Sequence, residues 1–314
     1  MKILDQIAFK RARAFIMASG WALEQARYRY VFEGGSASEV LDALATFRNE
    51  DGGFGKSLEP DLQAPHSSAL CTSVAFQTLR SLKADSGDAM VRSGISYLLA
   101  THTTTDGKAN GWRIIPESAG QYPHAPWWNQ EGRGEELARF SLNPSAELLG
   151  YFYDYRSLVP LEVIQALSDR VLEELNGVET IEMHQLLCCL RLWQTRDLPN
   201  SIRDALKKKL ATTISGAVAK DPAEWEGYSL RPLQVVDGRN SPFITGLEDS
   251  VQLNLDYEIA SQNKDGSWSP TWNWGDAFPD VWPRARTEWS GILTMQKLIL
   301  LKRFGRIEGV TAGC

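Results

Sequence analysis

The strongest constraint on the fold is a segment that the chain contains twice. Residues 41–54 read LDALATFRNEDGGF, and residues 255–268 read LDYEIASQNKDGSW. Each copy ends a helical run in a polar tip, an Asp-Gly turn and an aromatic residue, Phe54 or Trp268. The glycine can adopt a positive φ without steric cost, and the aromatic ring can then fold back over the end of the helix. A chain that repeats such a unit is expected to have a repeat architecture.

The spacing of the tips predicts the number of units. A looser third copy is Asp106-Gly107, followed by Gly111-Trp112. The tips end at Phe54, Trp112 and Trp268, so the gaps are 58 and 156 residues, and the second gap is about three times 52. About six helical hairpins therefore fit the chain, with the middle tips no longer recognisable. The segments after the clear tips also align, which places Gln77 opposite Gln296.

Helix-spaced apolar residues dominate the chain, and alternation of period two is absent beyond a few residues. The fold class is therefore predicted to be all-α. Ser36 and Glu39 form a capping-box pattern before the helix that leads to the first tip, and Ser67 is the expected cap of the next helix. The other predicted helices cover residues 3–18, 21–32, 68–83, 88–102, 144–156, 161–175, 179–196 and 201–218, and a final pair flanks a loop at 268–286.

Stacked hairpins can form an open solenoid or close on themselves. A solenoid is expected to have a polar capping helix at each end, whereas both terminal helices here have apolar faces. Closure into a single domain over residues 1–314 is therefore the favoured interpretation.

Composition excludes several functional classes. A net charge of −6 argues against a nucleic-acid partner, and no apolar run approaches the roughly 20 residues that span a bilayer. Residues 1–20 lack the apolar core of a signal peptide, and four cysteines in this length do not suggest a disulfide framework. His184 and Cys188 share a helix face, but no third ligand has compatible spacing, so no metal site is expected. We expect a cytoplasmic enzyme or binding protein, and the oligomeric state stays open.

The repeated tips resemble a known family. FRNEDGGFG and SQNKDGSW look like the QW-type repeats of terpene cyclases and of protein prenyltransferase β-subunits. The whole chain, including FGKSLEPDLQAP, resembles small bacterial members of that superfamily. This resemblance implies an α/α toroid of about six inner and six outer helices, a closed barrel of helical hairpins around a central cavity. It implies a small apolar substrate such as an isoprenoid and no cofactor. The D-x-D-D and D-D-x-x-D stretches of the cyclases and the prenyltransferase zinc ligands have no counterpart here.

Glu59 and Asp61 are the candidate acid pair. Side chains two apart in an extended segment point the same way, and Pro60 is expected to hold this segment extended. Two neighbouring carboxylates cannot both ionise cheaply, so one would keep its proton and act as a general acid. The alternative is that they cap helices or bind Lys56 and nearby backbone amides.

Histidine and tryptophan residues in the long loops complete the predicted site. His66 is the expected hydrogen-bonding partner of the acid pair, although a loop histidine can also have a purely structural role. Aromatic rings in the loops can stabilise a carbocation or stack on a sugar, or they can plug the ends of the barrel. The predicted substrate-binding residues are Trp112, His124, Trp127, Trp128, Trp272 and Trp282, with Trp274 beside them.

Three functions fit these residues. The first is a terpene cyclase-like enzyme in which Asp61 or Glu59 donates a proton in a central aromatic-lined cavity. The second is a carbohydrate-active α/α barrel, a hydrolase or lyase, which would use the same carboxylates and His124 with Trp127 and Trp128 as sugar platforms. The third is a toroid that binds a ligand without catalysis.

Overall fold

A computed structural model describes residues 1–105 and 108–312. These residues are mostly helical and contain one short antiparallel sheet of two strands, which confirms the all-α class. The strands are β1 (Thr103–Thr105) and β2 (Lys108–Gly111). The predicted third tip, Asp106-Gly107, lies outside the described residues.

The α-helices are α1 (Gln6–Ser19), α2 (Ala22–Phe32), α3 (Ala37–Ala45), α4 (Ala69–Ser81), α5 (Ala89–Thr101), α6 (Gly134–Ala138), α7 (Leu142–Asp154), α8 (Leu161–Gly177), α9 (Met183–Trp193), α10 (Asn200–Ala217), α11 (Pro232–Val235), α12 (Glu248–Ala260) and α13 (Trp282–Arg303). The 3-10 helices are η1 (Glu117–Gln121), η2 (Pro126–Trp128), η3 (Arg156–Leu158) and η4 (Pro222–Trp225). Among the described helices, none combines the length and the apolar character that a bilayer crossing requires.

Two local predictions need correction. The last loop ends earlier than predicted, because α13 begins at Trp282. Pro283 lies in the first turn of this helix, which accommodates proline because the missing N–H would have no partner there. Ser68, and not Ser67, caps α4, since its hydroxyl accepts from the backbone N–H of Cys71 at 3.0 Å. The Ser67 hydroxyl instead donates to Asp51 at 2.7 Å.

The chain divides into two compact units. Unit 1 consists of Met1–Ala43 and Ile214–Cys314, and unit 2 of Leu44–Thr213. The predicted single, closed toroid depends on how these units are placed, and it stays a prediction.

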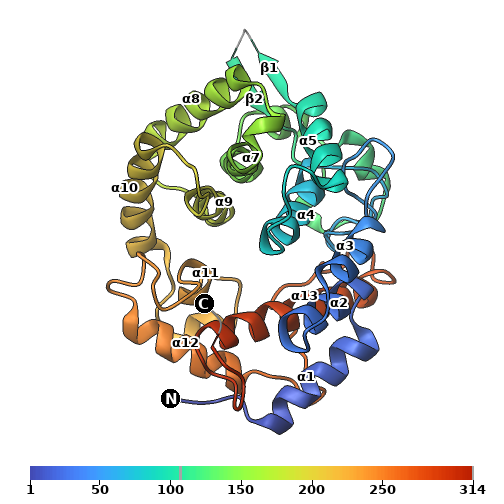
Figure 1. Ribbon diagram of the computed structural model, residues 1–314, viewed down its shortest axis with the longest axis vertical. Coiled ribbons are helices and arrows are strands. Elements are labelled where there is room, and N and C mark those ends of the chain that lie inside the picture. The colour runs from blue at the N-terminus through green and yellow to red at the C-terminus, as the bar shows by residue number, and fades with distance from the viewer. Residues whose placement is uncertain (106–107, 313–314) are drawn as a thin grey trace. The chain divides into compact units, whose positions relative to one another are not determined.

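Unit 1 joins the beginning of the chain to its end. Helix α1 packs against α2 and α13, so blue and red segments lie side by side in Figure 1. The backbone of Leu4 accepts from Glu308 at 2.9 Å and donates to Arg306 at 2.8 Å. The Arg306 side chain is almost fully buried and pairs with Asp256 at 2.8 Å.

Helix α7 is the centre of unit 2 and packs against α4, α8 and α9. Its Glu147 is 1% exposed and accepts hydrogen bonds from four side chains, one of them the Cys188 thiol of α9 at 3.7 Å. The other donors are Gln77 of α4 at 2.9 Å, Tyr151 of α7 at 2.7 Å and Arg191 of α9 at 3.0 Å. Because buried acceptors are costly when unpaired, this carboxylate fixes the three helices together.

The two clear tips have the same geometry. In each, the asparagine backbone N–H donates across the turn, from Asn49 to Gly53 and from Asn263 to Ser267, both at 2.9 Å. The turn glycines have a φ of 88° at residue 52 and 92° at residue 266. A Cβ added to the second glycine would lie 2.3 Å from the backbone carbon of Arg11, so the tip lies directly on α1. The repeat seen in the sequence is therefore a structural repeat.

The aromatic residue of each tip is tied to a later helix. The backbone N–H of Phe54 donates to the hydroxyl of Thr72 at 3.1 Å, and that of Trp268 donates to Thr294 at 3.0 Å. The Trp268 indole also donates to the carbonyl of Glu258 at 2.7 Å, so the ring folds back onto the end of α12 as predicted.

These bonds also correct the alignment of the following helices. They place Thr72 opposite Thr294, three residues from the alignment that matched Gln77 with Gln296. The two glutamines differ in their surroundings, because Gln77 binds Glu147 whereas Gln296 is exposed.

Replacing the glycine of the second tip tests the importance of this contact. Gly266→Ala should lower the free energy of unfolding by about 2–4 kcal/mol, since it adds left-handed strain and an overlap with α1. Gly227→Ala is the matched control, because no atom lies within 4 Å of its added Cβ and its φ is not positive. Urea unfolding of both variants measures the difference. Equal stability of the two variants would show that the tip does not depend on glycine.

Candidate acidic site

The loop after the first tip pairs with a distant segment of unit 2. Leu62 and His124 form an antiparallel bridge. The backbone N–H of Gln63 donates to Pro123 at 2.9 Å, and that of Ala125 donates to Asp61 at 2.8 Å. This pairing brings the acidic segment next to His124, one of the predicted site residues.

The acidic segment is a turn and not the extended stretch that Pro60 was expected to produce. The backbone N–H of Leu62 donates to the carbonyl of Glu59 at 3.0 Å, which closes a turn with Pro60 at its second position. Proline favours that position because its fixed φ matches the turn. The side chain of Gln63 donates to the Pro60 carbonyl at 2.8 Å and holds the turn in place.

The residues before this turn have unusual backbone angles. Lys56 and Ser57 are consecutive non-glycine residues with φ of 53° and 65°. Such conformations cost energy, and they concentrate at functional sites. The Lys56 ammonium donates to the carbonyls of Thr46 at 3.2 Å and Arg48 at 2.7 Å. It therefore holds the end of the preceding helical run and forms no ion pair with Glu59 among the described residues.

Both carboxyl groups are buried, Glu59 at 9% and Asp61 at 3% exposure. Burial, and then the charge of Asp61, raises the pKa of Glu59 well above its usual value of 4.5, although the backbone N–H groups of Asp61 and Leu62 oppose the shift. Oε2 of Glu59 is buried without a hydrogen-bond partner among the described residues. Glu59 is therefore the group that holds its proton to a higher pH than an exposed glutamic acid.

The turn lies against apolar and aromatic side chains. Leu62 belongs to a buried cluster against which Tyr122 and Trp128 also pack. The other members are Ala64, Ile115 and Ala119, with Leu70 and Ile114 at the edge. The indole N–H of Trp128 is buried and has no hydrogen-bond partner among the described residues. The surroundings of the acidic turn thus combine low polarity with an unpaired donor and an unpaired carboxyl oxygen.

A buried thiol lies near Glu59. Cys71, in the first turn of α4, is 1% exposed. Burial raises its pKa to about 12, and the charge of Glu59 adds to the shift. Since the thiolate is the nucleophilic form, Cys71 contributes packing to this region and no nucleophile near neutral pH.

The two predicted histidines have different positions. His124 is 8% exposed, and its Nδ1 lies 2.6 Å from the carbonyl of Tyr122. His66 is exposed, and its ring meets the edge of the Tyr122 ring at 5.4 Å between centroids. The structure therefore brings His124 to the acidic turn, whereas no hydrogen bond joins His66 to Glu59 or Asp61 in the part of the chain that is described.

The predicted tryptophans do not form one group. Trp112 is 3% exposed, donates its indole N–H to Leu98 at 2.8 Å and packs on Phe152, so it belongs to the core of unit 2. Trp127 is 39% exposed and precedes the half-buried Trp128 in η2.

The remaining predicted tryptophans belong to unit 1. Trp272 makes edge contacts with Tyr228 at 5.7 Å and Trp289 at 5.1 Å. Trp282 packs on Trp274 at 5.6 Å. Each of these ring contacts joins residues of unit 1 alone, whereas the acidic turn belongs to unit 2.

Sequence reasoning missed three buried glutamates on helices. Burial raises the pKa of Glu24 to about 7, although Arg27 lies 3.6 Å away. Glu147 and Glu258 are each paired with cations. A signal existed for Glu258, which falls on the buried face of α12 at helical spacing from Val251 and Leu255. Glu59 differs from these three glutamates, because among the described residues it has a second carboxyl group beside it and no cation paired with it.

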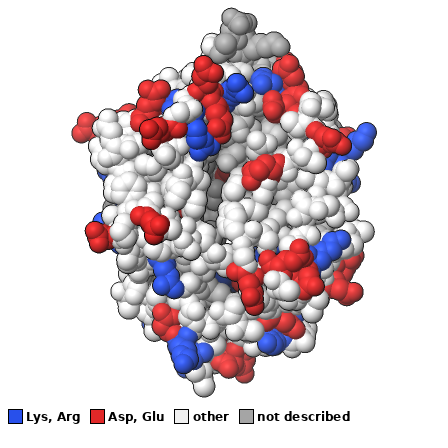
Figure 2. Space-filling view, turned by 180° about the vertical axis from the view of Figure 1, so that it is seen from behind, with Lys and Arg blue, Asp and Glu red and all other residues white. Residues whose placement is uncertain are grey.

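Surface charge and metal ligands add little to the site. Figure 2 shows acidic and basic side chains interspersed on the described part of that face. No cluster of three or more His, Cys, Asp or Glu that could hold a metal ion occurs in residues 1–105 and 108–312.

Comparisons with protein-family models, with curated proteins and with solved structures found no match.

The raised pKa of Glu59 predicts how stability depends on pH. The folded protein retains the Glu59 proton above the usual pKa of 4.5, whereas the unfolded chain releases it. This contribution is complete at acid pH and is lost as the pH rises through the raised pKa. Glu59→Gln should therefore match the wild type at acid pH and gain relative stability as the pH rises.

Urea unfolding at several pH values measures this difference. Glu50→Gln is the control, because Glu50 is exposed at the nearby tip. A stability difference between Glu59→Gln and the wild type that stays constant with pH would contradict the assignment.

Proposed function

We propose that the chain is a terpene cyclase-like enzyme in which Glu59 protonates an isoprenoid. The observation that carries the proposal is Oε2 of Glu59, which is buried beside Asp61 and has no hydrogen-bond partner among the described residues. A carbon–carbon double bond is a very weak base, so its protonation requires a carboxylic acid that keeps its proton away from water. Burial and the charge of Asp61 provide that condition by raising the pKa of Glu59.

The proposed step transfers one proton. The Glu59 O–H bond breaks as a C–H bond forms at one alkene carbon, and the other carbon becomes a carbocation. The carboxylates of Glu59 and Asp61 then stabilise the positive charge electrostatically. The rings of Tyr122 and Trp128, which pack on the cluster around Leu62, offer aromatic surface for the same purpose.

The remaining features of the proposal come from the resemblance. The QW-type repeats favour a closed α/α toroid in which the reaction takes place in a central, aromatic-lined cavity. The apolar cluster at Leu62 and Ile115 suits a hydrocarbon substrate, and the proposed step needs no cofactor. We place such an enzyme in the cytoplasm of a bacterium.

One observation favours a second candidate, a carbohydrate-active enzyme. Trp127 is 39% exposed and lies in η2 next to the half-buried Trp128, so its ring is open to a ligand. An exposed indole face can stack on a sugar ring. In that case Glu59 would protonate a glycosidic oxygen in place of an alkene carbon.

Glu59→Gln should slow product formation strongly, because glutamine cannot donate the proton. The expected loss is about 10²–10⁴-fold, the usual contribution of a general acid. The protein is incubated with farnesyl diphosphate, geranylgeranyl diphosphate and squalene, and cyclised products are measured by gas chromatography–mass spectrometry. Glu50→Gln should keep wild-type activity.

Asp61→Asn separates the proton donor from its neighbour. Removal of the Asp61 charge should lower the pKa of Glu59, so activity should fall at a lower pH than in the wild type. Product formation by Glu59→Gln at the wild-type rate would exclude Glu59 as the donor. If no isoprenoid is converted and an oligosaccharide raises the melting temperature, the carbohydrate-active candidate replaces the first.

A further inference from the structure

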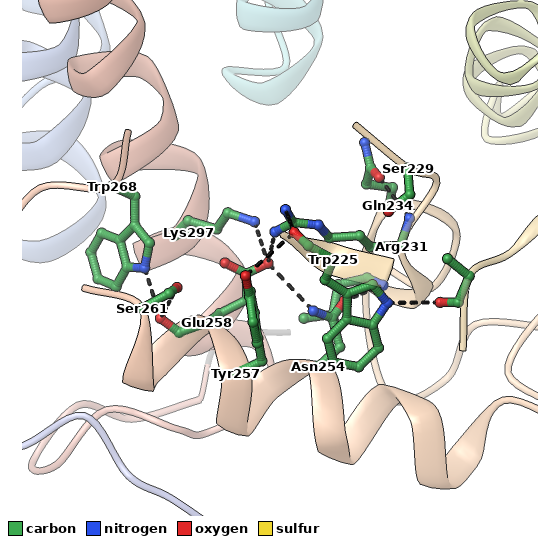
Figure 3. Close-up of polar contacts among 12 residues, drawn as sticks. Trp225, Ser229, Arg231, Gln234, Asn254, Tyr257, Glu258, Ser261, Trp268 and Lys297 are labelled. Carbon is green, nitrogen blue, oxygen red and sulfur yellow. Dashed lines mark hydrogen bonds and ion pairs between the residues drawn. The ribbon is translucent and has the colours of Figure 1, made fainter. Parts of the chain in front are cut away.

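A second cluster of buried charges lies in unit 1, where Lys297 and Arg231 both reach the carboxylate of Glu258 (Figure 3). The ammonium of Lys297, on α13, lies 2.6 Å from Oε1 of Glu258. Nη1 of Arg231, at the start of α11, lies 3.2 Å from the same oxygen. The side chains are 2% exposed for Glu258, 12% for Arg231 and 19% for Lys297.

The charges of this cluster do not balance. Two cations share one carboxylate, and no second carboxylate lies within ion-pair distance of either cation among the described residues. The cluster around Glu147 in unit 2 differs, because there a single cation, Arg191, pairs with a single carboxylate. An excess charge in a mostly buried position is costly unless an anion accompanies it.

The repeat shows that the fold does not require these charges. When the two tips are superposed in sequence, Glu258 corresponds to Leu44. When the following helices are aligned on Thr72 and Thr294, Lys297 corresponds to Ala75. Leu44 and Ala75 are both fully buried. The first copy thus forms the same tip with apolar side chains, so the charges of the second copy point to a function.

The amide oxygens next to the cluster already accept hydrogen bonds from the backbone, whereas the cations still have N–H donors available. The Asn254 side chain accepts from Leu233 at 3.2 Å, and the Gln234 side chain accepts from the backbone of Arg231 at 2.8 Å. The Lys297 ammonium has three N–H donors, and its partner among the described residues is the Glu258 carboxylate. Nη2 of Arg231 donates to the carbonyl of Trp225, and Nδ2 of Asn254 donates to Oε1 of Glu258 at 3.4 Å. Both cations keep further N–H donors.

We propose that Lys297 and Arg231 bind the carboxylate of a small-molecule ligand in unit 1. One excess positive charge matches a singly charged oxyanion, whereas a phosphate monoester would bring a second charge that the cluster does not neutralise. Glu258 positions both cations and limits their attraction for other anions. The proposal is independent of the acidic turn of unit 2.

Two variants with opposite expected effects test the site. Lys297→Met leaves Arg231 and Glu258 as a balanced pair, so it should weaken carboxylate binding by about tenfold, the value of one charge-assisted hydrogen bond. Glu258→Gln removes the internal competitor and should tighten binding. Lys264→Met is the matched control, because Lys264 is exposed on the same unit.

The probes are acetate, benzoate and octanoate, with benzyl alcohol as the neutral analogue and inorganic phosphate as the doubly charged one. Isothermal titration calorimetry should show saturable binding of at least one carboxylate, weaker in high salt, and none of the alcohol. Circular dichroism verifies that each variant is folded. Should Glu258→Gln unfold, Lys297→Met alone decides the outcome.

Absence of saturable carboxylate binding would overturn the proposal. So would equal affinity in the wild type and Lys297→Met. Tighter binding of phosphate than of every carboxylate would exclude the singly charged ligand.

Discussion

The structure depends on a hydrogen bond between the end of each tip and a later helix. In both copies the backbone N–H of the aromatic residue donates to a threonine hydroxyl, Thr72 or Thr294. The bond is buried, so it fixes where the chain leaves the tip. The glycine of the turn allows this geometry because it has a positive φ and no side chain to meet the neighbouring helix.

The candidate site follows from that constraint. The loop that leaves Phe54 passes through two strained residues, Lys56 and Ser57, and then turns at Pro60. Its pairing with the segment around His124 buries Glu59 and Asp61 together. Local backbone geometry thus places two carboxyl groups where water cannot stabilise both of their charges, and that raises the pKa of Glu59.

Much of the local structure was predictable from the sequence. Apolar periodicity placed most of the long helices to within a few residues, and the Asp-Gly tips marked the structural repeat. Local sequence patterns gave wrong predictions where contacts between distant segments determine the structure. Ser67 was predicted as the cap of α4, but its hydroxyl binds Asp51 of a separate segment, and Ser68 caps the helix instead. The short η helices and α6 lie in loops that lack a periodic pattern.

The candidate site was predictable in part. The acidic pair was predictable because Glu59 and Asp61 are close in the chain. The position of His124 beside them was not, because it depends on the pairing of residues 61–63 with 123–125. The Glu258 cluster combines residues from α11, α12 and α13, which no short motif connects. Charge pairs of this kind depend on packing, so a single sequence does not reveal them.

The protonation state of Glu59 is the most direct test of this account. Infrared difference spectroscopy at neutral pH, with the wild type compared against Glu59→Gln, isolates the carboxyl C=O stretch of this one residue. The account predicts a band of a protonated carboxylic acid in the wild type that Glu59→Gln lacks. A carboxylate band in its place would contradict the account.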